Sequence, residues 1–234
     1  MSGLSLPPLF DAMATAGDDP FAVAIAQARS GCDAGLVTYD LRPDILRAAI
    51  VFAPEVPLQE AVAVMPVCGV GFQNAFGALA PPEVAVHLEW GGTLRVNGGK
   101  CGSLKAAAFP TDPAATPDWL VVGLELMLWP KSEDTGLTPD ETALYNEGCA
   151  DIEAPQLLEA WVRHTLVWIN RWLDEGTRPV HAEWKPLAHG IDTTVNIGTQ
   201  SGTFLGVDEH FGMILKSGET TTIIPLTDIL TEAQ

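Results

Sequence analysis

The sequence predicts an α+β fold in which helices flank a central mixed β-sheet and a small β-barrel follows. Short strand-like runs alternate with helical patterns through most of the chain, which favours a sheet covered by helices. The apolar run Trp119–Trp129 is typical of a strand buried on both faces, and therefore of a central strand. From about Leu187 the composition changes to short β-branched segments joined by turns. We therefore divide the 234 residues into one domain at 1–186 and a second at 187–234.

An acidic N-cap opens the first expected helix. Asp18-Asp19 stands before Pro20, a residue favoured at the first helical position, and Gly31 lies beyond the end. The turn Arg42-Pro43-Asp44 separates two apolar runs that predict strands. The next apolar residues recur at helical spacing, and Pro66 with two glycines is expected to bend that helix. The expected elements are a helix from 20 to before 31, strands at 36–39 and 48–53, and a helix at 58–79.

A hairpin and a long amphipathic helix complete the first domain. Asn97-Gly98 is the strongest short signal for a hairpin turn. The segment Pro155–Glu175 places apolar side chains in two adjacent rows, and Gly176 stands at the C-cap. The rows are Leu157, Trp161, Thr165, Trp168 and Trp172, and beside them Leu158, Val162, Leu166, Ile169 and Leu173. The expected strands are 84–90, 93–96, 101–108 and 119–129, then, after an acidic loop at 131–153 and this helix, 193–199, 202–207, 212–216 and 220–226.

Acidic side chains outnumber basic ones by 30 to 12, which gives a net charge of −18. This balance argues against binding nucleic acid or an anionic membrane surface, because both need a basic face. No apolar run approaches the roughly 20 residues that span a bilayer, and no secretory signal is expected. The cysteines are Cys32, Cys68, Cys101 and Cys149. They have no zinc-ligand spacing and are expected as reduced thiols, so the sequence predicts a soluble, cytoplasmic protein.

The acidity is uneven along the chain. The segment Leu36–Lys105 holds five basic and six acidic residues, a net charge of −1. A nearly neutral segment can tolerate an anionic small molecule. A buried sheet with few charges of either sign has the same composition, and the sequence leaves both interpretations open.

One hairpin carries a specific resemblance. Trp90, the turn Val96-Asn97-Gly98 and then Lys100 follow one another as in the central hairpin of biotin protein ligases, within the biotin/lipoate protein ligase superfamily. The family pattern is Lys-Trp-Pro-Asn-Asp, a strand, a turn, and Lys-(apolar)-Ala-Gly-Ile. The stretch Gly202–Glu209, followed by Met213–Leu215, resembles the closing SH3-like β-barrel of the same family. The order of elements resembles this superfamily from about residue 18 to the end.

The resemblance implies a reaction and a set of site residues. In the family, the carboxylate of biotin or lipoate attacks the α-phosphate of ATP with Mg²⁺, and the acyl-adenylate passes to a lysine of a carrier-domain protein. Lys100 matches the catalytic lysine that holds the carboxylate and then the adenylate phosphate, although a solvated turn lysine has the same spacing. The ligand-binding positions expected beside it are Trp90, Gly102, Ser103, Arg42 and Tyr39. Gly102 would line the pocket, or would mark a β-bulge.

Several departures remove charge that the family uses to hold phosphate. Glu89 stands where the family has lysine, and Gly91-Gly92-Thr93 replaces Pro-Asn-Asp. The arginine-rich loop is reduced to the tight turn Tyr39–Asp44, which leaves Arg42 as the expected surviving cation. Asp18-Asp19-Pro20 replaces the Ser-Thr-Asn that opens the family's first helix. These changes predict a depleted catalytic apparatus.

Three hypotheses follow, and the sequence leaves open whether the chain is an enzyme. The first is a divergent biotin- or lipoate-protein ligase that uses ATP. The second is a pseudo-ligase that binds a cofactor, a nucleotide or a carrier domain without adenylation. The third is an assembly partner that forms homodimers through a sheet edge or the tryptophan-rich helix. With no winged-helix segment before the first helix, no repressor function is expected. Cys101 could act as a nucleophile, but packing is the favoured interpretation.

Overall fold

The computed structural model describes residues 3–132 and 138–232, and two β-sheets organise it. The strands of the larger sheet are β1 (Asp11–Ala14), β2 (Leu36–Leu41), β3 (Ile45–Phe52), β4 (Val86–Leu88), β5 (Thr93–Val96), β6 (Gly99–Phe109) and β7 (Trp119–Met127). Their order across the sheet is β1-β2-β3-β7-β6-β5-β4. The β1–β2 pair is parallel and the other pairs are antiparallel. The sheet is therefore mixed and β7 is its middle strand, as the sequence predicts.

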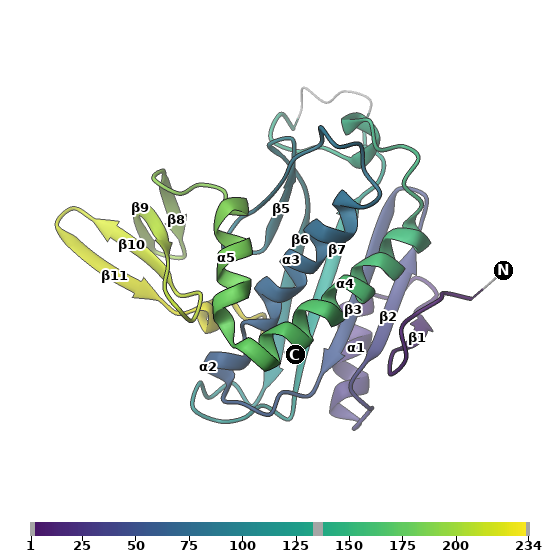
Figure 1. Ribbon diagram of the computed structural model, residues 1–234, viewed down its shortest axis with the longest axis horizontal. Coiled ribbons are helices and arrows are strands. Elements are labelled where there is room, and N and C mark those ends of the chain that lie inside the picture. Colours follow the sequence, from purple (N-terminus) through teal and green to yellow (C-terminus); the bar gives the residue numbers. More distant parts are fainter. Residues whose placement is uncertain (1–2, 133–137, 233–234) are drawn as a thin grey trace.

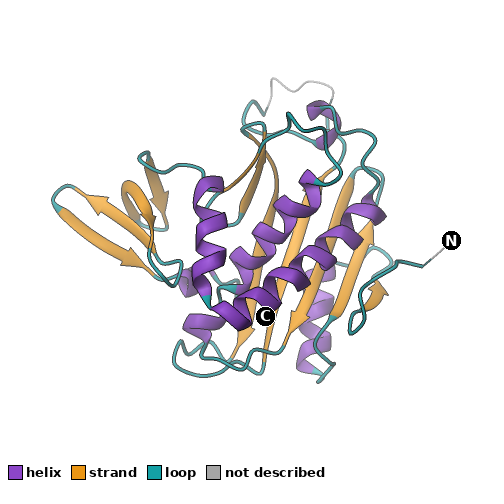
Figure 2. Ribbon diagram, viewed as in Figure 1, coloured by secondary structure: helices purple, strands orange, loops and turns teal. Residues whose placement is uncertain are grey.

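Helices cover the two faces of the larger sheet (Figure 1). They are α1 (Pro20–Arg29), α2 (Leu58–Ala61), α3 (Val64–Gly77), α4 (Ala154–Glu175) and α5 (Thr177–Leu187), with short 3₁₀ turns at Leu144–Glu147 and Leu226–Ile229. Figure 2 shows α3 and α4 side by side in front of the sheet and α1 behind it. The Asp19 carboxylate caps α1 by accepting a hydrogen bond from the Phe21 backbone N–H at 3.1 Å, as the acidic N-cap predicts.

The helix expected at 58–79 consists of two helices. The chain breaks at residues 62–63, before Pro66, instead of bending at Pro66. Helix α2 ends at Ala61 and α3 begins at Val64, so Pro66 lies in the first turn of α3. A proline ring clashes with the carbonyl four residues earlier, here that of Val62, and cannot donate to it. The regular helix is therefore interrupted before the proline, while both glycines are accommodated inside α3.

Helix α4 packs against α3 through the row that the sequence predicts. Trp161 is fully buried, and its indole Nε1 donates to the Cys68 carbonyl at 3.1 Å. A Cβ added at Gly71 of α3 would lie 2.7 Å from Thr165 Oγ1, so the two helices approach closely. The second row leaves the core toward the C-terminal end, where Leu173 is 64% exposed.

The smaller sheet consists of β8 (Thr194–Ile197), β9 (Gln200–Val207), β10 (Met213–Ser217) and β11 (Thr220–Ile224) in the antiparallel order β11-β10-β9-β8. Among the strands that the structure describes, β8 and β11 are the outer ones and do not pair, so the expected small barrel is an open sheet. The chain then returns to the larger sheet, where the Thr231 N–H donates to the Ala106 carbonyl of β6 at 2.8 Å. Helix α5 and strand β1 were not expected from the sequence.

In the two ranges that the structure covers, no helix has both the length and the apolar character needed to cross a membrane.

Candidate functional site

Helix α1 covers only one end of its face of the larger sheet. Helix α1 packs on Ala49, Val51, Ala107 and Val121, which lie toward one end of their strands. Toward the other end, polar side chains replace these small apolar ones. Asp40 of β2 is in register with Arg47 of β3, Arg47 with Glu125 of β7, and Glu125 with Ser103 of β6. Because side chains in register share a face, these four form a polar row across the sheet.

Lys100 stands at the edge of a cavity next to this row. Asn97 (φ 48°) and Gly98 (φ 90°) form the hairpin turn, which sets Lys100 near the start of β6. The Lys100 backbone is held on both sides: its N–H donates to Asp140 O at 2.7 Å, and its carbonyl accepts from the Thr142 N–H at 2.9 Å. Its side chain is exposed and forms no ion pair with another described residue. Lys100 is thus a positioned, uncompensated cation.

The cavity has a volume of about 340 Å³. Lys100, Gly102 and Ser103 all line it, so three of the predicted site residues are brought together. Glu125 and Glu141 contribute carboxylates to the same lining. Space of this size is at the lower end of what small-molecule sites in proteins enclose. The cavity therefore combines two lysines, Lys100 and Lys131, with polar groups in a volume suited to a small ligand.

Gly102 is required by the close approach of β6 to β7. A Cβ at this position would lie 2.2 Å from the Glu125 carbonyl oxygen. The pairing of β5 with β6 also shifts here, from Leu94 opposite Gly102 to Arg95 opposite Lys100, which leaves Cys101 as the extra residue. This is the bulge that the alternative interpretation of Gly102 expected.

The structure does not bring Trp90 to the Lys100 cavity. Trp90 is buried, and its Nε1 donates to the Phe211 carbonyl at 2.7 Å. Phe211 lies between β9 and β10, so this hydrogen bond joins the larger sheet to the smaller one. Trp90 points to the same side as Leu88, which packs in the core, whereas Lys100 faces solvent. Its hydrogen bond anchors the C-terminal sheet, and the indole also lines a separate, small apolar cavity with Met65 and Thr93.

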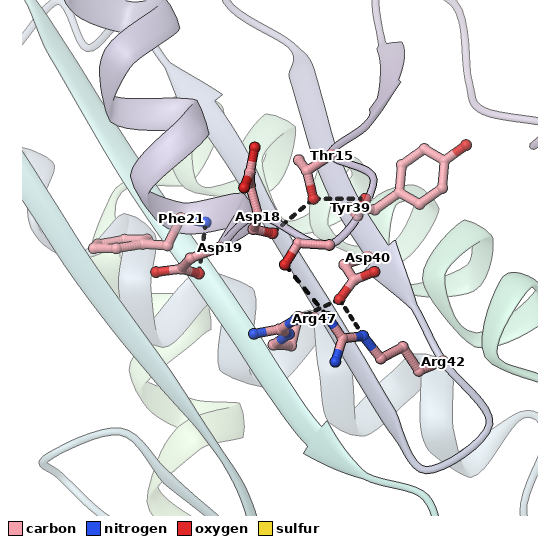
Figure 3. A network of polar contacts seen from close by, with 9 residues as sticks. Thr15, Asp18, Asp19, Phe21, Tyr39, Asp40, Arg42 and Arg47 are labelled. Atoms are coloured by element: carbon pink, nitrogen blue, oxygen red, sulfur yellow. Dashed lines mark hydrogen bonds and ion pairs between the residues drawn. The ribbon is translucent and has the colours of Figure 1, made fainter.

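Tyr39 and Arg42 lie on the β2–β3 hairpin but not at the cavity. Tyr39 is half-buried against the main core, because it points to the opposite face from its neighbour Asp40. In Figure 3 its ring points away from the polar network. The Arg42 Nε contacts Asp40 Oδ2 at 2.8 Å, and Arg42 also donates to the Gly17 carbonyl at 3.3 Å.

Arg42 shares this face with two cations that lie outside the turn Tyr39–Asp44, Arg47 and Lys105. Arg47 donates to the same Asp40 carboxylate, and this hydrogen bond raises the pKa of Arg47. Lys105 Nζ lies 3.6 Å from Asp19 Oδ2 and 4.4 Å from the Phe21 ring centroid. Sequence reasoning missed both, since only the register of distant strands shows which strand residues share the open face.

Each of these cations already has a carboxylate partner. Arg95, which lies opposite Lys100 in the β5–β6 pairing, is paired with Glu89. Transferring phosphoryl groups are held by cations and N–H donors preorganised for the incoming charge. No group of three or more His, Cys, Asp or Glu side chains in the described parts of the chain is arranged to hold a metal ion. At the Lys100 cavity, by contrast, Lys100 and Lys131 form no ion pair with another described residue.

Cys101 borders the cavity but is fully buried. Burial raises the pKa of its thiol to about 12. A nucleophilic cysteine reacts as the thiolate, so this side chain acts as packing, as favoured above. Cys32, Cys68, Cys101 and Cys149 are all free.

The raised pKa of Cys101 predicts how stability changes at high pH. The unfolded thiol ionises near its ordinary value of 9.0, whereas the folded one stays protonated to about 12. Its contribution is therefore complete below pH 9 and is lost as the pH rises toward 12. Over that range the free energy of unfolding should fall by up to about 1.4 kcal/mol per pH unit from this group. Urea unfolding across the range should show a shallower decline in Cys101→Ala, and equal slopes in variant and parent would contradict the assignment.

The open sheet, the lysine-bearing hairpin and the appended antiparallel sheet define a class: proteins built on the scaffold of ligases for carboxylate cofactors. The model of the biotin/lipoate A/B protein ligase family matches residues 6–186, and the chain belongs to this family. Residues 194–232 match a domain of unknown function, DUF4444. No curated protein matches the chain significantly.

Solved structures agree with this assignment. A biotin protein ligase-like protein of unknown function from Silicibacter sp. TM1040 is 58% identical, with a TM-score of 0.93 over 98% of this chain and 100% of that one. The biotin protein ligase from Aquifex aeolicus in complex with biotin and ATP is 13% identical, with a TM-score of 0.69 over 92% and 94%. That from Leishmania major in complex with biotinyl-5-AMP is 15% identical, with a TM-score of 0.58 over 93% and 99%. The last two show the shared fold, and the predicted family and fold class are confirmed.

Proposed function

We propose that the chain is a pseudo-ligase: it binds a small acyl cofactor of the biotin or lipoate type through its carboxylate, without activating it with ATP. One observation carries the proposal. Lys100 is an exposed cation without a carboxylate partner among the described residues, whereas Arg42, Arg47, Lys105 and Arg95 are each paired with one. Lys131, a second exposed lysine, lines the same cavity. Two ammonium groups suit a carboxylate, whereas a triphosphate needs a larger set of preorganised donors.

The chain's own residues provide what such binding needs. The hydrogen bonds that Lys100 donates to the Asp140 carbonyl and accepts from the Thr142 N–H fix its backbone, so only its side chain must be ordered when the ligand binds. Ser103 supplies a hydroxyl on the same strand, and Gly102 lets β6 and β7 stay close at the cavity floor. The cavity lies within the domain proposed at 1–186. The domain proposed at 187–234 contacts that first domain at Trp90, away from the cavity. We place the protein in the cytoplasm, where its four free cysteines stay reduced.

The second candidate is an active ATP-dependent ligase that transfers biotin or lipoate to the lysine of a carrier-domain protein. Membership of the ligase family favours it, as does the Aquifex aeolicus relative in complex with biotin and ATP. Under this candidate, Mg-ATP and the acyl cofactor together would yield pyrophosphate and a labelled carrier domain. The two candidate functions therefore differ in whether pyrophosphate and a labelled carrier domain are formed, and not only in the affinity for the acyl cofactor.

The test is a calorimetric titration with biotin, lipoate and octanoate. We expect one of them to bind the parent protein and to lose about tenfold to a hundredfold in affinity in Lys100→Ala, because a hydrogen bond to a charged group contributes about 1.5–3 kcal/mol. Thermal melting should be nearly unchanged, since the side chain is exposed. Lys216→Ala, an exposed lysine on β10, is the matched control and should bind like the parent.

Equal binding by Lys100→Ala and the parent would refute the site. Pyrophosphate release with Mg-ATP, or label on a carrier domain, would replace the pseudo-ligase by the active enzyme.

A further inference from the structure

Two arginines of the open face converge on one carboxylate. Asp40, in β2, accepts a hydrogen bond from Arg47 of β3 and forms an ion pair with Arg42 of the β2–β3 turn. Figure 3 shows both guanidinium groups directed at Asp40 from different sides. Paired guanidinium groups are the usual means by which proteins hold carboxylates and phosphates. The geometry is that of an anion site, and the anion in it is a residue of the chain itself.

The donors of this pair are not fully used. The Asp40 side chain is only 10% exposed, whereas that of Arg42 is 48% exposed and accessible to a ligand. The Nε of Arg47 is buried and has no hydrogen-bond partner in the parts of the chain that the structure describes. An unpaired buried donor costs free energy that an added acceptor would recover. The arginine pair therefore has donors for an anion, but the Asp40 carboxylate cancels one of its two positive charges, and Asp19 and Glu125 also act on Arg47 electrostatically.

A row of polar side chains links the arginine pair to the Lys100 cavity. The polar row runs from Asp40 through Arg47 and Glu125 to Ser103, one strand at a time. Glu125 and Ser103 also line the cavity. A ligand with its carboxylate at Lys100 and a phosphate group extending along the row would place that phosphate against Arg47 and Arg42.

We propose that Asp40 is the residue that sets ligand selectivity: it occupies the arginine pair as an internal anion and excludes phosphate-bearing ligands from the site. This inference rests on the proposed function and extends it. It names the class of ligand that the site accepts, unphosphorylated carboxylates, and it names Asp40 as the residue that excludes phosphate-bearing ligands. Replacing the carboxylate by an amide keeps its shape and a hydrogen-bond acceptor but removes the charge. The arginine pair then becomes an open anion site.

The experiment measures binding of inorganic pyrophosphate to the purified full-length chain, with ATP as a second probe. Asp40→Asn should bind pyrophosphate at least about tenfold more tightly than the parent, with an affinity that falls as salt rises. Asp40→Ser, which also lacks the charge, should show the same gain. Asp44→Asn is the matched control, since Asp44 is an exposed carboxylate on the same hairpin and forms no ion pair with another described residue. It should leave pyrophosphate binding unchanged.

Adding Arg47→Gln to Asp40→Asn should abolish the gain, which identifies the arginine pair as the site. If folded Asp40→Asn and Asp40→Ser bind pyrophosphate no better than the parent, Asp40 serves as a structural ion pair only and the inference is overturned. An equal gain in Asp44→Asn would show a general charge effect and would overturn it as well. Failure of the proposed function is separate, because it appears as unchanged carboxylate binding in Lys100→Ala.

Discussion

Trp161→Ala is expected to lower the free energy of unfolding by about 3–5 kcal/mol. Trp161 is fully buried between α4 and α3, and its Nε1 donates to the Cys68 carbonyl. Alanine would leave a cavity because the two helices cannot collapse further: Gly71 and Thr165 are already in close contact. The carbonyl of Cys68 would also lose the indole as its donor. Urea unfolding followed by circular dichroism measures the change.

Leu173→Ala on the same helix is the matched control. Leu173 belongs to the second apolar row but is largely exposed, so its loss should change the free energy of unfolding by no more than about 0.5 kcal/mol. Similar losses for the two variants would contradict this prediction, because burial against α3 would then not explain the effect of Trp161→Ala.

Trp90→Ala is expected to loosen the attachment of the smaller sheet while lowering stability by about 3–5 kcal/mol. The ring is buried beside Met65, Leu104 and Trp184, and its Nε1 is bonded to Phe211 across the two sheets. Hydrogen exchange at the amides of β9 and β10 should therefore accelerate more than at β3 and β7.

Trp90→Phe separates packing from hydrogen bonding. It keeps an aromatic ring but leaves the Phe211 carbonyl without this donor, at a cost of about 1–3 kcal/mol. If Trp90 is an anchor, Trp90→Phe binds the carboxylate ligand like the parent. A loss of affinity as large as that of Lys100→Ala would return Trp90 to the ligand site.

Much of the fold could be predicted because the relevant signals are local. The cap of α1 needs only Asp19 and Pro20, and the hairpin turn needs only Asn97 and Gly98. The apolar run of β7, in which Glu125 is the one charged residue, predicts its place in the middle of the sheet. Each of these features is encoded within a few neighbouring residues, so sequence patterns suffice.

The elements that were missed depend on contacts between distant segments. Strand β1 is exposed along its length and becomes a strand by pairing in parallel with β2. Helix α5 contains Pro179 in its first turn and Pro186 near its end. Because proline usually interrupts a helix, the sequence pattern does not predict a helix there.

The same distinction between local and distant contacts applies to the residues of the candidate site. Lys100, Gly102 and Ser103 were predicted together because they follow one turn in sequence, and the structure places them on one cavity. Tyr39 and Arg42 were assigned by their hairpin, without knowledge of which face each side chain takes. Asp40 and Arg47 were overlooked, since their pairing depends on the register of β2 with β3.

The return of the chain to β6 through Thr231 has a consequence for how ligands enter. The smaller sheet is fastened before its first strand, where the His189 N–H donates to Leu88 O at 2.8 Å, and after its last strand, where Thr231 bonds to Ala106. A unit tied at both ends cannot swing on a single hinge as a lid. Because no described residue of the smaller sheet lines the Lys100 cavity, these two ties hold the sheet against the main domain without covering that cavity.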